Sequence, residues 1–257
     1  MVDEAVAARL KLPAYPRSAA YDAEFMLETA MGPSVLWLAE ALSAHLDLRP
    51  GMRVLDLGCG RAGSSIFFAK EFGVSVVAAD LWIKPTENWA RVQRFGLESH
   101  VMPISAEAHA LPFADGYFDA IVSLDAYHYF GTDDLYAWTL ARYLRPGGSV
   151  GIVVPGVVHE VEAAPAHLAA HWDPQFKSFH TPEWWRRHLE HTQLFDSVES
   201  GVIADGHLHW ALWEEVRIAA GMNGPYGART SSDDLDLLRA DDGRTLLLQW
   251  LVAEKRT

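Results

Sequence analysis

The feature that most constrains the fold is a glycine-rich turn between an apolar run and an amphipathic run. Residues 53–57 have the composition of a short buried strand, and residues 64–72 have helical periodicity. Between them, Gly58, Gly60 and Gly63 stand at the spacing G-x-G-x-x-G. Glycine has no Cβ, so the backbone amides of such a turn can approach a ligand closely. A strand, a glycine turn and a helix in this order are typical of ligand-binding α/β sheets.

The same alternation of strand and helix continues along the chain. It predicts strands at residues 74–79, 101–104, 120–124 and 149–154, and helices at residues 87–95 and 135–143. Two later strand-like runs, 197–203 and 246–253, are separated by a helix at 210–220 and a polar loop rich in glycine and aspartate. Alternating βα units predict a doubly wound α/β domain with a mostly parallel sheet.

The length and apolar content predict a single domain. The chain has 257 residues, of which 50% are hydrophobic, so it can bury one substantial core. Helices through residues 21–28 and 34–45 precede the core, and about forty residues after Pro155 interrupt the alternation with helices near 163–171 and after Thr181. The expected parts are a helical cap at 1–48, a ligand-binding core at 49–155, an inserted lid at 156–194 and C-terminal strands with a helix at 195–257.

Charge and composition exclude several classes of function. The formal net charge of -13 repels nucleic acid backbones and anionic lipid headgroups, which leaves small molecules as the expected partners. The sequence contains neither a long apolar segment nor a signal peptide pattern, so we expect a cytoplasmic protein without membrane association. The single cysteine, Cys59, excludes an internal disulfide and a cysteine-based zinc site.

The glycine turn alone is compatible with two ligands. Asp80 stands twenty residues after Gly60 at the end of the second predicted strand, where a carboxylate accepts hydrogen bonds from ribose hydroxyls. That arrangement suits NAD and S-adenosylmethionine equally well. Asp56 separates the two, because a carboxylate beside the turn would repel the pyrophosphate of NAD but attract the ammonium and sulfonium groups of S-adenosylmethionine.

Residues 54–60, with the sequence VLDLGCG, resemble the first motif of class I S-adenosylmethionine-dependent methyltransferases. Four further segments resemble later motifs of that family in order and spacing, namely residues 79–81, 107–113, 117–122 and 144–148. The resemblance is to the small-molecule group that includes ubiquinone-biosynthesis-type and cyclopropane-synthase-like enzymes. It implies a Rossmann-like, mostly parallel seven-stranded sheet that ends in an antiparallel C-terminal hairpin.

The resemblance also implies a set of cofactor-binding residues. Gly58 and Gly60 would cradle the methionine part of the cofactor, and Asp80 would hold the ribose. Leu81 would pack against the adenine, whose amino group Glu107 would receive. The complete set expected to bind the cofactor is Asp56, Gly58, Gly60, Asp80, Leu81, Glu107 and Leu124.

Candidate catalytic residues follow the fourth predicted strand, whose carboxyl end faces the ligand crevice of such a sheet. Asp125 and His128 are three residues apart, so one helical turn would bring them together. His128 is the candidate general base, and Asp125 could orient its imidazole or bind a substrate amine. A histidine that only packs is the alternative, because positioning alone accelerates methyl transfer. Tyr127, Tyr129 and Tyr21 are candidate substrate-binding residues.

A metal site is not expected. Asp205, His207 and His209 alternate and would share one face of an extended segment, but Trp210 and Trp213 continue with helical spacing.

The expected function is therefore methyl transfer, of the EC 2.1.1 type, from S-adenosylmethionine to a small-molecule acceptor through oxygen or nitrogen rather than carbon or sulfur. An NAD-dependent oxidoreductase and a noncatalytic S-adenosylmethionine-binding protein remain the alternatives.

Overall fold

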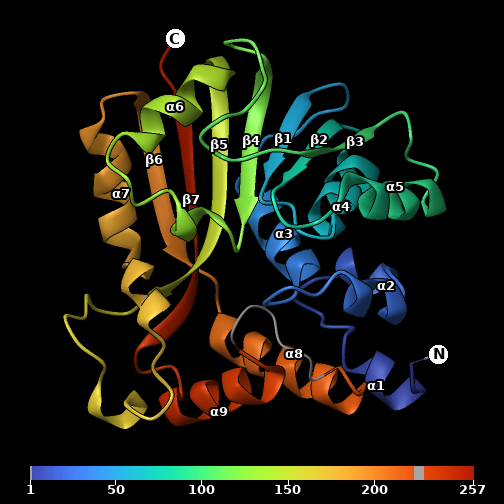
Figure 1. Ribbon diagram of the computed structural model, residues 1–257, viewed down its shortest axis with the longest axis vertical. Helices are drawn as coiled ribbons and strands as arrows, with labels where there is room; N and C mark the ends of the chain where they lie inside the picture. The colour runs from blue at the N-terminus through green and yellow to red at the C-terminus, as the bar shows by residue number, and fades with distance from the viewer. Residues whose placement is uncertain (1, 223–228) are drawn as a thin grey trace.

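The fold is an α/β sandwich around one mixed sheet (Figure 1), seen in a computed structural model that describes residues 2–222 and 229–257. Within these residues the sheet has seven strands in the order β3-β2-β1-β4-β5-β7-β6. Only β7 runs antiparallel, and it pairs with both β5 and β6. The predicted fold class is thus confirmed. The strands are β1 (Arg53–Leu57), β2 (Ser75–Asp80), β3 (Val101–Ser105), β4 (Phe118–Leu124), β5 (Leu144–Val157), β6 (Phe195–Val202) and β7 (Leu246–Lys255).

Successive residues of the central strands point into two different cores, which explains why these strands are apolar throughout. Val54 packs in the core beneath one layer of helices, whereas Leu55 and Leu57 pack in the core beneath the other. The first layer consists of α3 (Val35–Ser43), α4 (Gly63–Phe72) and α5 (Pro85–Arg94), and the second consists of α6 (Tyr136–Tyr143) and α7 (Pro182–His191).

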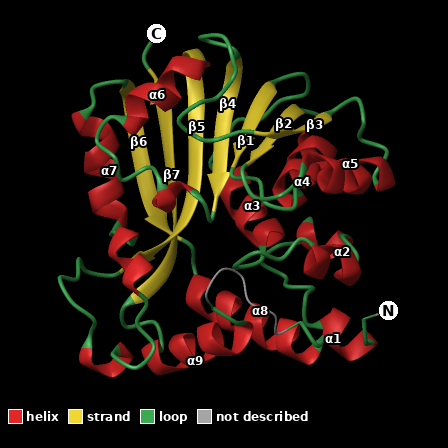
Figure 2. Cartoon of the chain, in the orientation of Figure 1, coloured by secondary structure: helices red, strands yellow, loops and turns green. Residues whose placement is uncertain are grey.

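A third group of helices lies below the sheet in Figures 1 and 2, where the strand arrows point. It joins the two ends of the chain: α1 (Glu4–Ala8) and α2 (Ala23–Glu28) come from the N-terminal part, and α8 (Gly206–Ala219) and α9 (Ser231–Asp241) from the C-terminal part. The indole of Trp213 on α8 donates a hydrogen bond of 2.8 Å to the carbonyl of Gly32. The N-terminal cap is therefore anchored on a helix that follows it by 181 residues.

The C-terminal half departs from the sequence prediction in two places. The helix expected at 163–171 is only one short 3-10 turn, because Pro165 is extended and caps its start. The polar loop expected after residue 220 contains α9, which buries Leu235, Leu237 and Leu238 and begins with a capping box. Residues 223–228 of that loop lie outside the described residues.

The 3-10 helices are η1 (Ser18–Ala20), η2 (Tyr127–Tyr129), η3 (Ala166–Leu168) and η4 (Pro174–Ser178).

Candidate functional site

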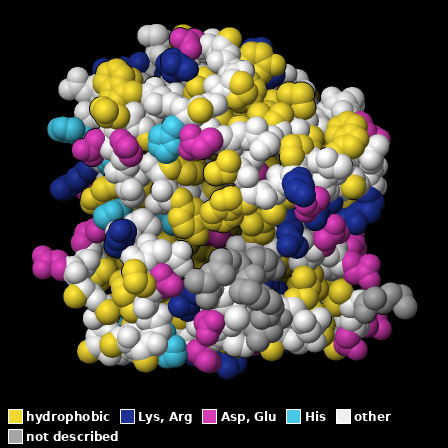
Figure 3. Space-filling model, viewed as in Figure 1, with side chains coloured by type: hydrophobic (Ala, Val, Ile, Leu, Met, Phe, Trp, Pro, Cys, Tyr) yellow, Lys and Arg dark blue, Asp and Glu magenta, His cyan; other side chains and the backbone are white. Residues whose placement is uncertain are grey.

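A cavity of about 310 Å³ opens at the carboxyl ends of β1, β2 and β4. Figure 3 shows a hollow in this face of the molecule, bordered by hydrophobic side chains. The lining includes the N-terminal cap, the glycine turn and the segments after three strands. Its residues are Thr29, Met31–Pro33, Val35, Leu57–Arg61, Ala79–Trp82, Ala106–His109, Leu124–Ala126, Tyr129 and Phe130.

The backbone of the glycine turn has the close approach that its sequence predicts. Gly58 has a φ of +74° and Gly60 a φ of +52°, in the left-handed region that favours glycine. A Cβ on Gly58 would lie 2.4 Å from the Cβ of Ala126, which follows β4. A side chain at position 58 would thus collide with the neighbouring loop, and both glycines line the cavity.

Asp80 at the end of β2 fixes the turn and lines the same cavity. Its Oδ2 accepts a hydrogen bond of 2.8 Å from the amide of Gly60, and its Oδ1 accepts from the amides of Trp82 at 2.8 Å and Ile83 at 2.9 Å. Leu81 also lines the cavity and is 60% exposed. This exposed apolar side chain beside a carboxylate suits an adenosine group.

Asp56 lies behind the glycine turn rather than in the cavity wall. It is fully buried, and its Oδ2 accepts hydrogen bonds of 2.6 Å from the hydroxyls of both Ser64 and Ser65 at the start of α4. Its Oδ1 has no hydrogen-bond partner within the described residues. Burial raises the pKa of Asp56 to about 6. The sequence predicted a direct contact between Asp56 and the ligand, but Asp56 is not among the residues that line the cavity.

The far side of the cavity carries the other two residues assigned by resemblance. Glu107 lines the cavity, and its Oε1 lies 2.8 Å from the Nδ1 of His109. The hydrogen bond from His109 lowers the pKa of Glu107. Leu124, the last residue of β4, is buried and also lines the cavity.

Asp125 is the carboxylate at the inner wall of the cavity. Its φ of 55° is unusual for a residue other than glycine and turns the chain sharply at the end of β4. A Cβ on Gly32 would lie 2.0 Å from Asp125 Oδ2, so the carboxylate packs directly against the backbone of the cap. The glycine at position 32 therefore leaves the space that this side chain occupies.

The electrostatic surroundings of Asp125 are acidic. Burial, followed by the charges of Asp234 and Glu214, raises the pKa of Asp125 well above its ordinary value. Each of these two neighbours has its own arginine: Glu214 lies 2.8 Å from Arg217, and Asp234 lies 2.5 Å from Arg229. No ion pair to Asp125 is found among residues 2–222 and 229–257. Asp125 thus has no ion-pair partner in the described part of the chain, although Arg61 also lines the cavity.

His128 is buried beside this wall and does not line the cavity. Its side chain is 2% exposed, and its ring centroid lies 4.1 Å from that of Tyr129 and 5.4 Å from that of Phe179. Nδ1 has no partner among the described residues, and burial lowers the pKa of His128 to about 3. A neutral imidazole packed between aromatic rings favours the packing role over that of proton acceptor.

The three tyrosines considered for substrate binding lie in different places. Tyr129 lines the cavity. Tyr127 is fully buried against Trp185, and the hydroxyl of Tyr21 donates to Glu71 at 3.0 Å. Among these three, only Tyr129 is positioned to contact a ligand in this cavity.

The segment of alternating Asp205, His207 and His209 is not extended. Asp205 has a left-handed backbone and precedes α8, which places both histidines in the first turns of the helix. The Nδ1 of His209 lies 3.0 Å from the hydroxyl of Tyr15. Over the described ranges, no group of three or more histidine, cysteine, aspartate or glutamate side chains could hold a metal ion. None of the described helices combines the length and apolarity needed to span a bilayer.

Sequence reasoning did not identify the cap residues of the site. Met31, Gly32 and Pro33 line the cavity because the cap folds back over the sheet, a contact between segments far apart in sequence. The only local signal was the Gly32-Pro33 pair, which predicts a break between helices.

Comparisons with known proteins agree with this arrangement. Residues 54–148 match a family described as "Methyltransferase domain". Methyltransferase GfsG of Streptomyces halstedii is 34% identical over 131 residues, which are 49% of this chain and 47% of that protein. The chain thus spans about half the length of this curated relative.

Solved structures share the fold at low identity. Phosphoethanolamine N-methyltransferase 2 of Haemonchus contortus, solved with phosphomonomethylethanolamine and S-adenosylhomocysteine, superposes with a TM-score of 0.73 at 18% identity, covering 100% of this chain and 61% of that one. The cyclase SpnF superposes with a TM-score of 0.68 at 17% identity, covering 86% and 81%. Residues 54–148 match the methyltransferase domain family, and the chain has the fold of class I S-adenosylmethionine-dependent methyltransferases.

Proposed function

We propose that this protein transfers a methyl group from S-adenosylmethionine to a basic nitrogen of a small molecule, an activity of the EC 2.1.1 type. The observation that carries the choice of nitrogen is Asp125, a cavity-lining carboxylate without a cationic partner among the described residues. A carboxylate that lacks an ion-pair partner in this position is stabilised by a ligand cation. An ammonium group on the acceptor supplies that cation.

The residues of the cavity fit S-adenosylmethionine better than NAD. Gly58 and Gly60 leave their backbone accessible, and Asp80 offers carboxylate oxygens at the end of β2. Asp80, Glu107 and Asp125 outnumber the one arginine of the lining, Arg61, so the net charge of the wall is negative, which disfavours a pyrophosphate and favours a sulfonium and an ammonium group. Bound there, S-adenosylmethionine would supply the methyl group, and the electrons of the broken C–S bond would stay on sulfur as the C–N bond forms.

Asp125 has two tasks in this proposal. It holds the acceptor ammonium inside the cavity, and it takes one proton from it, which leaves the nitrogen lone pair free to react. Because burial and two neighbouring carboxylates raise its pKa, Asp125 accepts a proton more readily than an ordinary aspartate. Tyr129 lines the same wall and borders the acceptor, while His128 supports the ring of Tyr129 from behind.

Calorimetric titration tests the cofactor assignment. We expect saturable binding of S-adenosylmethionine and S-adenosylhomocysteine and none of NAD in the same buffer. Binding of NAD alone would overturn the assignment and favour the oxidoreductase alternative.

An acceptor screen tests the choice of nitrogen. Primary and secondary amines are compared with alcohols of the same size, with S-adenosylhomocysteine formation as the readout. Turnover of the alcohols and not of the amines would exclude a nitrogen acceptor. Tight cofactor binding with no turnover on either series would favour the noncatalytic alternative.

Because the lone Cys59 is buried, we also propose a reducing, cytoplasmic location, which cell fractionation tests.

A further inference from the structure

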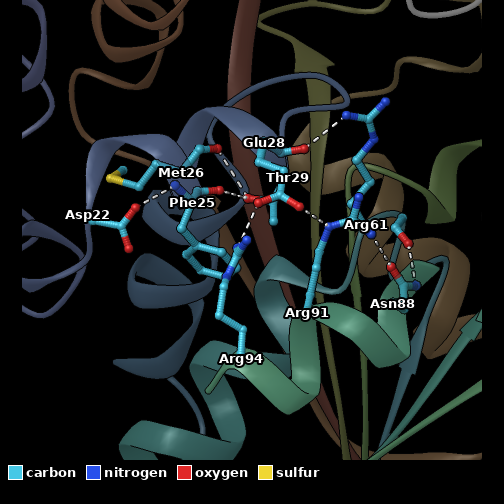
Figure 4. Close-up of polar contacts among 10 residues, drawn as sticks. Asp22, Phe25, Met26, Glu28, Thr29, Arg61, Asn88, Arg91 and Arg94 are labelled. Atoms are coloured by element: carbon cyan, nitrogen blue, oxygen red, sulfur yellow. Dashed lines mark hydrogen bonds and ion pairs between the residues drawn. The ribbon is translucent and has the colours of Figure 1, made fainter. Parts of the chain in front are cut away.

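An ion-pair cluster joins the N-terminal cap to α5 (Figure 4). Glu28, the last residue of α2, accepts hydrogen bonds from two arginines of α5. Its Oε1 lies 2.8 Å from Arg91 Nε, and its Oε2 lies 2.6 Å from Arg94. The backbone carbonyl of Glu28 also accepts a hydrogen bond of 2.9 Å from Arg61, the residue after Gly60 in the glycine turn.

The same cluster continues inward to the glycine turn through one buried amide. Arg91 donates to the Oδ1 of Asn88 at 3.0 Å, and the Nδ2 of Asn88 donates to the carbonyl of Gly60 at 2.9 Å. Asn88 is 1% exposed. Since the amide of Gly60 donates to Asp80, both polar groups of this glycine are fixed by side chains. Four residues thus form a continuous path from the cap to the turn, which we name the Glu28–Gly60 relay: Glu28, Arg91, Asn88 and Gly60.

The end of the relay at Glu28 adjoins a wall of the cavity. The residues that follow Glu28 include Thr29, Met31 and Gly32, all of which line the cavity. The sulfur of Met31 lies 2.9 Å from the position that a Cβ on Gly60 would take, so the cap rests directly on the turn. A ligand between cap and turn must displace this contact or enter while the cap is open.

We propose that Asn88 and Glu28 are positioning residues for the cofactor: the relay couples closure of residues 29–33 to the shape of the glycine turn. The identity of the ligand rests on the proposed function, whereas the coupling is a property of the protein itself. Neither residue is catalytic, because Asn88 acts through the Gly60 carbonyl and Glu28 acts through the arginines.

Three variants separate the two halves of the relay. Glu28→Gln weakens the pairs to Arg91 and Arg94, and Asn88→Ala breaks the path in the middle. Asn88→Asp keeps an oxygen for Arg91 but removes the donor to Gly60. The matched control is Asp47→Asn, which removes the acid of another surface pair, with Arg49, outside the cavity lining.

The readouts are hydrogen exchange of residues 22–35 in the ligand-free protein and the Kd for S-adenosylhomocysteine. We expect Glu28→Gln, Asn88→Ala and Asn88→Asp each to speed exchange in this segment, because each breaks the path between Glu28 and Gly60. Asn88→Ala and Asn88→Asp should each raise the Kd about tenfold, in keeping with one buried hydrogen bond. The double variant Glu28→Gln/Asn88→Ala should bind no more weakly than Asn88→Ala alone, because both changes break one path. Thermal unfolding identifies any variant that has not folded.

Two results would overturn the coupling: unchanged exchange in Glu28→Gln and Asn88→Ala, or affinity losses that multiply in the double variant. If wild-type protein binds no S-adenosylhomocysteine, the proposed function fails, and the exchange data on ligand-free protein still decide whether cap and turn are coupled.

Discussion

Asp125 concentrates the chemistry of the cavity in one side chain. It has a strained backbone, contacts the cap at Gly32 and faces the ligand space without a cation among the described residues. Such an arrangement is unfavourable for the free protein and becomes favourable when a cation binds. The placement of Asp125 is thus better explained by ligand binding than by a contribution to the stability of the folded protein.

Replacing the carboxylate tests this explanation. Asp125→Asn should lower kcat/KM for an amine acceptor by about a hundredfold, since a hydrogen bond to a charged group is worth about 2–3 kcal/mol. The Kd for S-adenosylhomocysteine, which carries no sulfonium, should change less than about threefold. Steady-state kinetics and calorimetry give the two values. A comparable loss in both would show that Asp125 only shapes the cavity.

The raised pKa of Asp125 also predicts the pH dependence of stability. Between the ordinary value of 3.8 and its raised pKa in the folded protein, the folded state binds more protons than the unfolded state. Its contribution to the free energy of unfolding therefore decreases as pH rises through this window. Asp125→Asn should be more stable than the wild type at pH 8 and should lose this advantage at pH 4. Urea unfolding at both pH values measures the difference, and an advantage independent of pH would contradict the interpretation.

Among the elements, α9 shows how local chemistry positions a charge that acts on the site from outside the cavity lining. Thr230 and Asp233 form a reciprocal capping box at its start, and the charge of Asp234 in its first turn helps to raise the pKa of Asp125. Asp234 also holds Arg229, so the start of the helix sets both charges near the cavity.

Removing the N-cap hydroxyl of α9 should lower the stability of the whole chain modestly. Thr230→Ala removes the hydroxyl that accepts from the Asp233 amide, and we expect a loss of about 1 kcal/mol in the free energy of unfolding. Denaturant unfolding measures this loss. The change Thr230→Ser keeps the hydroxyl and serves as the control. Equal losses in the two variants would show that the Thr230 hydroxyl does not stabilise the start of α9.

Element by element, the sequence predicts what local patterns encode. The glycine turn and the alternating strands are predictable because burial on both faces makes each strand a continuous apolar run. The start of α8 at Gly206 and the whole of α9 are not predictable from local patterns. Polar residues such as Asp233 and Asp234 are typical of loops, and only tertiary packing, which buries the neighbouring leucines, makes this segment a helix.

At the scale of the whole molecule, the cavity is a product of contacts that no local pattern specifies. The sequence identified its cofactor side through Gly58, Gly60 and Asp80, which lie next to recognisable strands. It could not place Gly32 against Asp125, because that contact depends on the cap being anchored by Trp213 on a helix near the other end of the chain. For the same reason Tyr21 and Tyr127 are indistinguishable by sequence from Tyr129, although only Tyr129 reaches the cavity.

Because cap and sheet enclose the ligand together, binding should stabilise the molecule as a whole. S-adenosylhomocysteine at one hundred times its Kd should add about 2.7 kcal/mol to the free energy of unfolding and raise Tm by about 5–10 °C. NAD should give no shift in the same scan. Asp80→Ala should abolish most of the shift through loss of the ribose contact and of the Gly60 hydrogen bond. A full shift in that variant would remove Asp80 from the binding site.

The position of β7 has a consequence for biogenesis. This strand is the last in chain order, yet it lies between β5 and β6 and is the only partner of β6 in the described sheet. During synthesis on the ribosome, the strands from β1 to β5 can therefore assemble in order, while β6 has no neighbour to pair with until β7 has emerged. Chains cut short before Leu246 would display two unpaired strand edges, a state prone to aggregation and to recognition by chaperones.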